Sequence, residues 1–256
     1  INNGESRPVA AAPAVTVETD EEIMTRIRER FDILHDMTKA CIAGDIRAMI
    51  VSGPPGVGKS FGVEQEIDKA VLFDKIKNTR LRAEVVKGAA TPIGLYQTLY
   101  KYSDPNSVVV FDDCDSILFD DVALNLLKGA LDSGKTRKIS WLSESRVLKQ
   151  EDIPTSFLFK GSVIFITNLK FDQVKSQRLK DHLEALQSRC HYLDLTLDTM
   201  RDKVLRIRQI AQQGQMFEDL GIGEIGSEII IDFLDANKNK FREMSLRMAI
   251  NVAQLY

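Results

Sequence analysis

The chain lacks several features that define specialised classes of protein. Its three cysteines, Cys41, Cys114 and Cys190, are far apart and odd in number, which excludes a disulfide framework and a spaced zinc cluster and is typical of a reducing compartment. No apolar run approaches the roughly 20 residues that a membrane-spanning helix needs. Positive charge is not in excess, because 37 acidic residues face 34 basic ones, so a dedicated DNA-coating protein is not indicated. We therefore expect a soluble cytoplasmic protein without a membrane partner.

What the sequence does contain is the composition of an ordinary globular protein. The hydrophobic content is 44% and the charged content 28%, in 256 residues, which is enough for one large domain with a small appendage. Residues 1–18 are rich in Ala, Pro and Val without a periodic pattern, and are predicted to form a flexible arm. The chain begins at Ile1 and stops within a helical pattern at Tyr256, which suggests that one or both ends are trimmed.

Strands and helices alternate between residues 19 and 197. Helices between successive buried strands favour a parallel sheet that is covered on both faces. We therefore expect an α/β fold, a three-layer αβα core with a parallel five-stranded sheet over residues 19–197. Residues 136–160 are predicted as a hairpin-like insertion, and three helical segments after the core as a small helical lid over residues 198–256. The predicted strands are 48–52, 83–87, 107–111, 162–167 and 192–195.

A glycine-rich loop follows the first predicted strand. Residues 53–60 read GPPGVGKS and match G-x-x-x-x-G-K-[ST] between a strand and a helix, the context of a P-loop in an NTPase core. Glycines let backbone N–H groups turn toward phosphates, and the helix N-terminus adds a favourable dipole; the alternative is a chance turn. Lys59 is predicted to reach the β- and γ-phosphates of ATP, and Ser60 to bind Mg²⁺. The predicted nucleotide-binding residues are Gly53, Pro54, Pro55, Gly56, Val57, Gly58, Lys59, Ser60 and Phe61.

The third predicted strand ends in carboxylates. Residues 108–115 read VVVFDDCD, so Asp112 and Asp113 lie at the carboxyl edge of the sheet, where open α/β folds bind their ligands. Asp112 is predicted to hold Mg²⁺, directly or through water, and Asp113 to be the base that orients the attacking water. The alternative is an acidic strand end that caps the next helix.

These two motifs resemble the Walker A and Walker B motifs of the AAA+ ATPase family, and the resemblance covers the chain from about residue 30 to its end. The family usually has Glu where this chain has Asp113. The shorter carboxylate would lie about one methylene further from the water, which implies slow turnover. The compact module with a short arm also resembles AAA+ proteins of bacteriophages.

Three further segments resemble AAA+ motifs. Asn168, at the end of IFITN, resembles the sensor 1 residue that positions the water, although Asn at a strand end also forms turns. Arg189 in LQSRC resembles the arginine finger of sliding-clamp loaders, which acts on a neighbouring subunit; a surface Arg at a helix end is the alternative. Arg247 in SLRMA resembles the sensor 2 residue, with Arg242 as the fallback and a solvated Arg as the alternative.

Signals for the substrate are weaker. Protein-threading members place an aromatic residue before a hydrophobic-Gly pair in the pore loop, and the pair Ile93-Gly94 lacks it. Trp141 lies in the insertion, where a substrate-touching hairpin sometimes projects, but a position at the edge of the core is the simpler interpretation.

The resemblance implies a homo-oligomer, a hexameric ring or a spiral, that hydrolyses Mg-ATP between subunits and remodels or translocates a macromolecule. Nucleic acid or nucleoprotein is favoured as the substrate. A protein-remodelling machine and a slow ATP-dependent assembly switch or loader are the alternatives.

Overall fold

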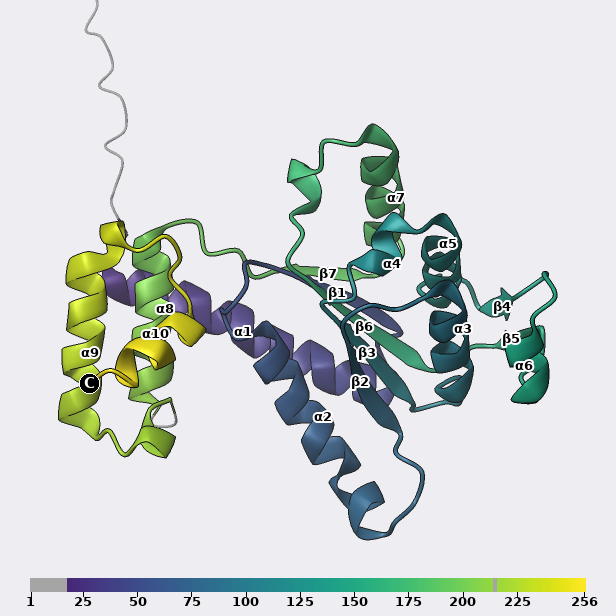
Figure 1. Ribbon diagram of the computed structural model, residues 1–256, viewed down its shortest axis with the longest axis horizontal. Coiled ribbons are helices and arrows are strands. Elements are labelled where there is room, and N and C mark those ends of the chain that lie inside the picture. Colours follow the sequence, from purple (N-terminus) through teal and green to yellow (C-terminus); the bar gives the residue numbers. More distant parts are fainter. Residues whose placement is uncertain (1–17, 214–215) are drawn as a thin grey trace, which may run out of the picture.

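The computed structural model describes residues 18–213 and 216–256 and consists of a sheet-centred core with a group of helices at one side (Figure 1). The arm predicted over residues 1–18 lies outside the described residues, apart from Glu18. All neighbouring strands of the main sheet are parallel, in the order β2-β3-β6-β1-β7. The predicted α/β fold is therefore confirmed. The strands are β1 (Ala48–Ser52), β2 (Ala83–Lys87), β3 (Val108–Asp112), β6 (Ser162–Thr167) and β7 (His191–Asp194).

The three central strands are buried on both faces. In β3, Val108 and Val110 pack into one hydrophobic cluster, while Val109 and Phe111 pack into the other. Strands β1 and β6 alternate in the same way, because successive side chains of a strand point to opposite faces. This arrangement explains the continuous apolar runs in the sequence.

Helices cover each face of the sheet (Figure 1). Residues of α1 and α2 belong to the cluster on one face, and residues of α3, α4, α5 and α7 to the cluster on the other. The covering helices are α1 (Asp20–Ala43), α2 (Lys59–Ile76), α3 (Pro92–Lys101), α4 (Ser116–Phe119), α5 (Asp121–Ala130) and α7 (Gln177–Gln187), with the 3₁₀ turn η1 (Phe171–Gln173) before α7.

Helix α1 extends from the core to the lid. Its capping box at Thr19 and Glu22 and the left-handed Gly44 after its last turn fix both ends. With 24 residues it is about 36 Å long. The backbone oxygen of Met24 accepts a hydrogen bond from Nε2 of Gln209 in the lid, at 2.9 Å. The N-terminal part of α1 thus lies against the lid and the rest against the core.

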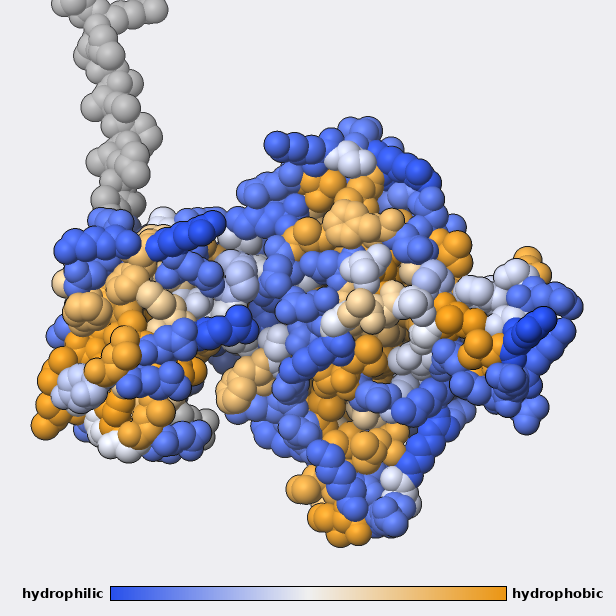
Figure 2. Space-filling model, viewed as in Figure 1, coloured by the Kyte–Doolittle hydropathy of each residue, from blue (hydrophilic) through white to orange (hydrophobic). Residues whose placement is uncertain are grey.

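The lid has a small hydrophobic core of its own, to which all three of its helices contribute. Its outer surface is apolar along α9, where Ile225 is 81% exposed and Phe233 51%. Figure 2 shows this apolar surface over the lid. Within residues 18–213 and 216–256, no helix has the length and apolarity to cross a membrane. The lid elements are α8 (Met200–Gln212), η2 (Glu218–Leu220), α9 (Glu224–Asn237), η3 (Lys238–Lys240) and α10 (Leu246–Ala253).

The insertion between β3 and β6 is a two-stranded antiparallel ribbon, β4 (Lys138–Ser140) and β5 (Ser156–Leu158), with α6 (Arg146–Gln150) between its strands. It projects from the body beside α3 and α5 (Figure 1). Trp141 packs against the Tyr96 ring at the margin of the core, with 5.8 Å between ring centroids. The hairpin-like insertion is confirmed.

One predicted boundary is wrong. The sequence predicts a helix that begins near Asp120, which agrees with the start of α5, and ends at Gly134, whereas α5 ends at Ala130. The side chain of Asp132 accepts a hydrogen bond from the backbone N–H of Gly134, at 3.3 Å. This local turn competes with helix continuation and ends α5 early.

Candidate nucleotide-binding site

The glycine-rich loop lies between β1, which ends at Ser52, and α2, which begins at Lys59. Gly56 and Gly58 have left-handed φ values of 71° and 100°, which residues with side chains rarely adopt. In the described part of the chain, no acceptor pairs with the backbone N–H groups of Gly56, Val57 or Gly58. Free N–H groups at a helix N-terminus form a site for phosphate, so the loop fits the group that the sequence predicts.

Lys59 is held inside this loop. It is 5% exposed, and its Nζ donates to the backbone oxygens of Gly53 and Pro54, at 2.7 and 2.8 Å. A third hydrogen bond, of 2.8 Å, goes to Oδ1 of Asn168. Burial lowers the pKa of Lys59 to about 8, although the nearby carboxylates, Asp113 foremost, act in the opposite direction. The ammonium group is therefore positioned at the loop by groups that phosphate oxygens can replace.

Asn168 connects Lys59 to Asp113. Its Nδ2 donates to Oδ1 of Asp113, at 2.7 Å, while its Oδ1 accepts from Lys59. Asp113 is exposed and has a left-handed φ of 53°, which is uncommon for a residue other than glycine. Three predicted catalytic residues are thus linked by hydrogen bonds: Lys59 at the start of α2, and Asp113 and Asn168, which directly follow β3 and β6.

Ser60 and Asp112 form the second predicted pair. The Ser60 hydroxyl donates to Oδ1 of Asp112, at 2.9 Å, and Lys87 Nζ lies 3.9 Å from the other carboxylate oxygen. Burial raises the pKa of Asp112, and the Ser60 hydrogen bond opposes this shift. One hydroxyl and one carboxylate fit the ligand set of Mg²⁺ in a phosphate site, where water and phosphate oxygens complete the octahedron. The remaining predicted loop residues, Pro55 and Phe61, are exposed.

A supporting hydrogen bond that was not predicted from the sequence lies beneath these residues. The buried Thr167 hydroxyl donates to Oδ1 of Asp115, at 2.7 Å, and accepts from the backbone N–H of Leu169, at 3.0 Å. These bonds fix the backbone on both sides of Asn168 and join the ends of β3 and β6. The sequence could have indicated this bond, because Asp115 ends the segment VVVFDDCD and Thr167 precedes Asn168 in the segment IFITN.

The lid contacts the loop through residues that the sequence analysis did not select. The backbone N–H of Leu246 donates to the oxygen of Gly56, at 2.8 Å. A Cβ atom added to Gly56 would lie only 2.5 Å from Cβ of Ser245. The Arg206 guanidinium stacks on the Phe31 ring, 3.5 Å from its centroid. The N-terminus of α10 is therefore in direct contact with the P-loop.

Arg206 also donates through Nε to the oxygen of Val57, at 3.4 Å, so it is the lid arginine bonded to the loop. Arg247 and the fallback Arg242 are exposed, and within the described residues the side chain of neither forms a hydrogen bond or an ion pair. The sensor 2 role of Arg247 stays a prediction.

Arg189 lies at the amino ends of the strands, whereas the P-loop follows the carboxyl end of β1. Arg189 precedes β7, whose first residue, His191, pairs with Met49 at the start of β1. Along the strand direction Arg189 is therefore about 20 Å from the loop after β1. Its Nη1 donates to the oxygen of Ala185, at 2.5 Å, and its Nε lies 3.7 Å from Asp132. The structure thus does not bring Arg189 together with the other predicted catalytic residues of its own chain.

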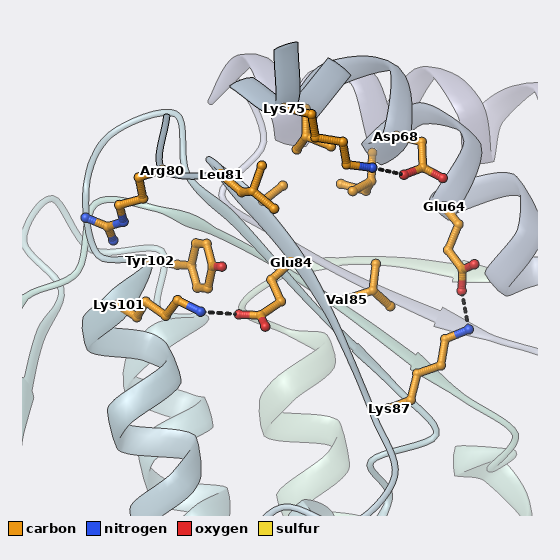
Figure 3. Close-up of a pocket in the computed structure, with 13 residues that line it drawn as sticks. Glu64, Asp68, Lys75, Arg80, Leu81, Glu84, Val85, Lys87, Lys101 and Tyr102 are labelled. Carbon is orange, nitrogen blue, oxygen red and sulfur yellow. Dashed lines mark hydrogen bonds and ion pairs between the residues drawn. The ribbon is translucent and has the colours of Figure 1, made fainter. Parts of the chain in front are cut away.

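A pocket of about 410 Å³ between α2 and β2 contains none of the predicted site residues (Figure 3). All of its charged side chains except Arg80 are paired with each other: Lys75 with Asp68, Lys101 with Glu84 and Lys87 with Glu64. It has no glycine-rich loop, so the P-loop is the better candidate for binding a nucleotide.

The parallel sheet, the P-loop at the end of β1 and the helical lid define a P-loop NTPase fold. The chain is 35% identical over 239 residues to the "uncharacterized 36.7 kDa protein in nrdC-mobD intergenic region" of Enterobacteria phage T4, a match that covers 92% of this chain and 71% of the phage protein. It belongs to the same family as that protein. No family model matches the chain.

A comparison with solved structures finds domain III of the Thermotoga maritima replication initiation protein DnaA, with a TM-score of 0.44 and 11% identity. This match covers 88% of this chain and 90% of that one. Drosophila ORC bound to DNA has a TM-score of 0.36 and 12% identity, covering 98% and 70%. The HORMA:CdnC:Trip13 complex of E. coli MS115-1 has a TM-score of 0.38 and 10% identity, covering 94% and 93%.

Proposed function

We propose that this protein is an AAA+-type ATPase that binds and hydrolyses Mg-ATP at the P-loop. The observation that carries the proposal is the hydrogen-bonded series Lys59–Asn168–Asp113, next to the pair Ser60–Asp112. Lys59 and Ser60 begin α2 directly after the loop, and Asp112, Asp113 and Asn168 stand at the ends of the neighbouring strands β3 and β6. Such an arrangement supports phosphoryl transfer, which depends on positioning and on electrostatic stabilisation.

Each residue has a distinct role in this proposal. Lys59 exchanges its bonds to loop carbonyls for bonds to the β- and γ-phosphates, and the free loop N–H groups bind the phosphate chain. Ser60 and Asp112 would hold Mg²⁺, which neutralises charge on the phosphate oxygens. Asp113 accepts a hydrogen bond from the attacking water, and Asn168 holds both Asp113 and Lys59 in place.

Arg189 completes the site of a neighbouring subunit. Its position at the amino edge of the sheet, about 20 Å from the loop of its own chain, supports a role in trans. An arginine at the γ-phosphate stabilises the charge of the transition state, so turnover requires assembly into a ring or spiral. We expect the energy of hydrolysis to move the lid against the core, because α10 contacts the P-loop directly.

The substrate that we favour is a nucleic acid or a nucleoprotein. Two features of the sequence support it: the segment around Arg189 resembles that of clamp loaders, and Ile93 lacks the preceding aromatic residue of protein-threading members. A second function, a slow assembly switch, is supported by Asp113. This exposed, short carboxylate stands where a longer one would reach the water more easily.

The test is steady-state ATP turnover at a protein concentration that permits assembly, with and without single- and double-stranded DNA. Lys59→Ala is expected to abolish turnover, whereas Lys69→Ala, which removes an exposed lysine of the same helix, should leave it unchanged. Equal turnover in the Lys59→Ala variant and the parent would refute the site.

The DNA response separates the two candidate functions. Stimulation by DNA that disappears at high salt supports a nucleic-acid motor or loader. Tight ATP binding with almost no turnover supports the assembly switch, and Asp113→Glu should then accelerate hydrolysis. No response to DNA with turnover present would direct the search to a protein substrate.

A further inference from the structure

A groove of about 550 Å³ lies between α5 and the insertion, away from the P-loop. One wall is α5, with Val122 and Leu126, and the other is β4 with the residues that follow it, Trp141 and Leu142. Leu142 is 95% exposed and Val122 is 52% exposed. Large apolar side chains are therefore presented to solvent on both sides of the groove.

The strand that borders the groove has an open edge. The backbone N–H of Trp141 donates to Thr155 and that of Phe159 to Arg137, so 141/155 and 137/159 are hydrogen-bonded pairs of the β4–β5 ribbon. Antiparallel pairs alternate, and the pair 139/157 between them is therefore of the same kind. The backbone groups of Lys138 and Ser140 consequently point away from β5, toward the other edge.

No residue of the described chain pairs with that edge, because the small sheet consists of β4 and β5 alone. Two N–H groups and two C=O groups are thus available beside an apolar wall. In addition, the buried indole Nε1 of Trp141 has no hydrogen-bond partner among the described residues. Open strand edges of this kind bind extended chains by adding a strand.

We propose that this groove binds an extended peptide of a partner protein as a third strand beside β4. The alternate side chains of the peptide that face α5 are apolar, and they pack against Val122, Leu126 and Trp141. Lys138 is the one charged residue among those lining the groove, so the peptide carries an acidic residue that faces it. A single lining cation offers little to a phosphate backbone, which favours a peptide over a nucleic acid.

The chain provides its own reporter, because Trp141 is its single tryptophan and it lines the groove. The probe is a pool of synthetic six-residue peptides in which Val, Ile and Leu alternate with Thr and Glu, without aromatic residues. Added to the full chain without nucleotide, the pool should change the Trp141 fluorescence with saturation. The absence of any saturable change would overturn the proposal and would leave the ATPase proposal untouched.

Strand addition makes a prediction that simple apolar binding does not. The tightest peptide of the pool is resynthesised twice, with N-methyl groups on one or the other set of alternate residues. Each version blocks one edge of the peptide, so one should bind as before and the other should lose at least about tenfold in affinity. Equal binding of both versions would contradict strand addition.

Variants of the chain provide the matching test. Ser140→Pro removes an outward N–H without touching the β4–β5 bonds and should weaken binding by about tenfold or more, whereas Ser140→Ala keeps the N–H and should bind normally. Val122→Asp changes the opposite wall of the groove and leaves the ribbon intact. It should also weaken binding, so the proposal stays testable if Ser140→Pro disturbs the ribbon. A larger fluorescence response to a 20-nucleotide oligo-dT than to any peptide would assign the groove to single-stranded nucleic acid and overturn the proposal.

Discussion

The contact between Gly56 and Ser245 allows a quantitative test of how the lid is attached. Gly56→Ala introduces a Cβ at a left-handed φ of 71°, which costs about 1–2 kcal/mol. The new atom would also lie 2.5 Å from Cβ of Ser245, and relief of this overlap costs about 1–3 kcal/mol. We expect Gly56→Ala to lower the free energy of unfolding by roughly 2–5 kcal/mol, and to weaken the bond between Leu246 and Gly56.

Urea unfolding of four proteins measures the two contributions separately: the parent, Gly56→Ala, Ser245→Gly and the double variant. Ser245→Gly alone should cost only a few tenths of a kcal/mol at the N-cap of α10. In the double variant it should restore the overlap contribution, about 1–3 kcal/mol, but not the backbone strain. Gly129→Ala, at a helical glycine with no neighbour within 4 Å, is the control and should be neutral or stabilising. If Ser245→Gly restores nothing, the lid does not rest on Gly56 in solution.

Two further predictions concern ion pairs and buried hydrogen bonds. Hydrogen bonds from the Arg82 side chain hold the pKa of Asp74 at about 2, below its ordinary value, so this pair stabilises the fold above about pH 4 and its contribution is lost as the pH falls toward 2. The urea midpoint should therefore fall less steeply between pH 5 and pH 2 for Asp74→Asn than for the parent. Asp68→Asn, at an exposed ion pair, is the control. Equal pH dependence of the midpoint in Asp74→Asn and the parent would contradict the stabilising role of the Asp74–Arg82 pair. Arg137 is buried and donates to the backbone oxygens of Ala130 and Gly161, at 2.8 and 2.7 Å. Arg137→Ala leaves both oxygens unpaired and should lower the free energy of unfolding, measured with urea, by roughly 2–5 kcal/mol. The control Lys138→Ala should change it by no more than about 0.5 kcal/mol. Similar changes in both variants would contradict a structural role for Arg137.

Much of the fold could be predicted from the sequence because local signals and tertiary packing agree. The apolar runs of β1, β3 and β6 are long enough to identify strands buried on both faces. Thr19 and Gly44 mark the ends of α1 through backbone hydrogen bonds that depend on nearby residues alone. The end of α5 was missed because it depends on a weak competition between the helix and the turn at Asp132.

Part of the candidate site could likewise be predicted from the sequence, and part could not. Motif spacing was sufficient to select Lys59, Ser60 and Asp112, because a P-loop and the end of a neighbouring parallel strand must meet at one edge. The contacts of Arg206 and Ser245 were not predictable, since they depend on how the lid docks on the core, and no local pattern encodes that. The roles of Arg189 and Arg247 depend on partners beyond a single chain and stay predictions.

The path of α1 has a consequence for dividing this protein into independently folding parts. Its first two turns lie against the lid, and Ile23, Ile27 and Phe31 share one apolar cluster with Leu205 of α8. A fragment that ends near residue 197 would expose the apolar side chains of Ile23, Ile27 and Phe31 to water. A fragment that begins there would lose α1, against which α8 packs. The boundary between core and lid is therefore discontinuous in sequence, and a separately expressed lid should require the first half of α1 to remain soluble.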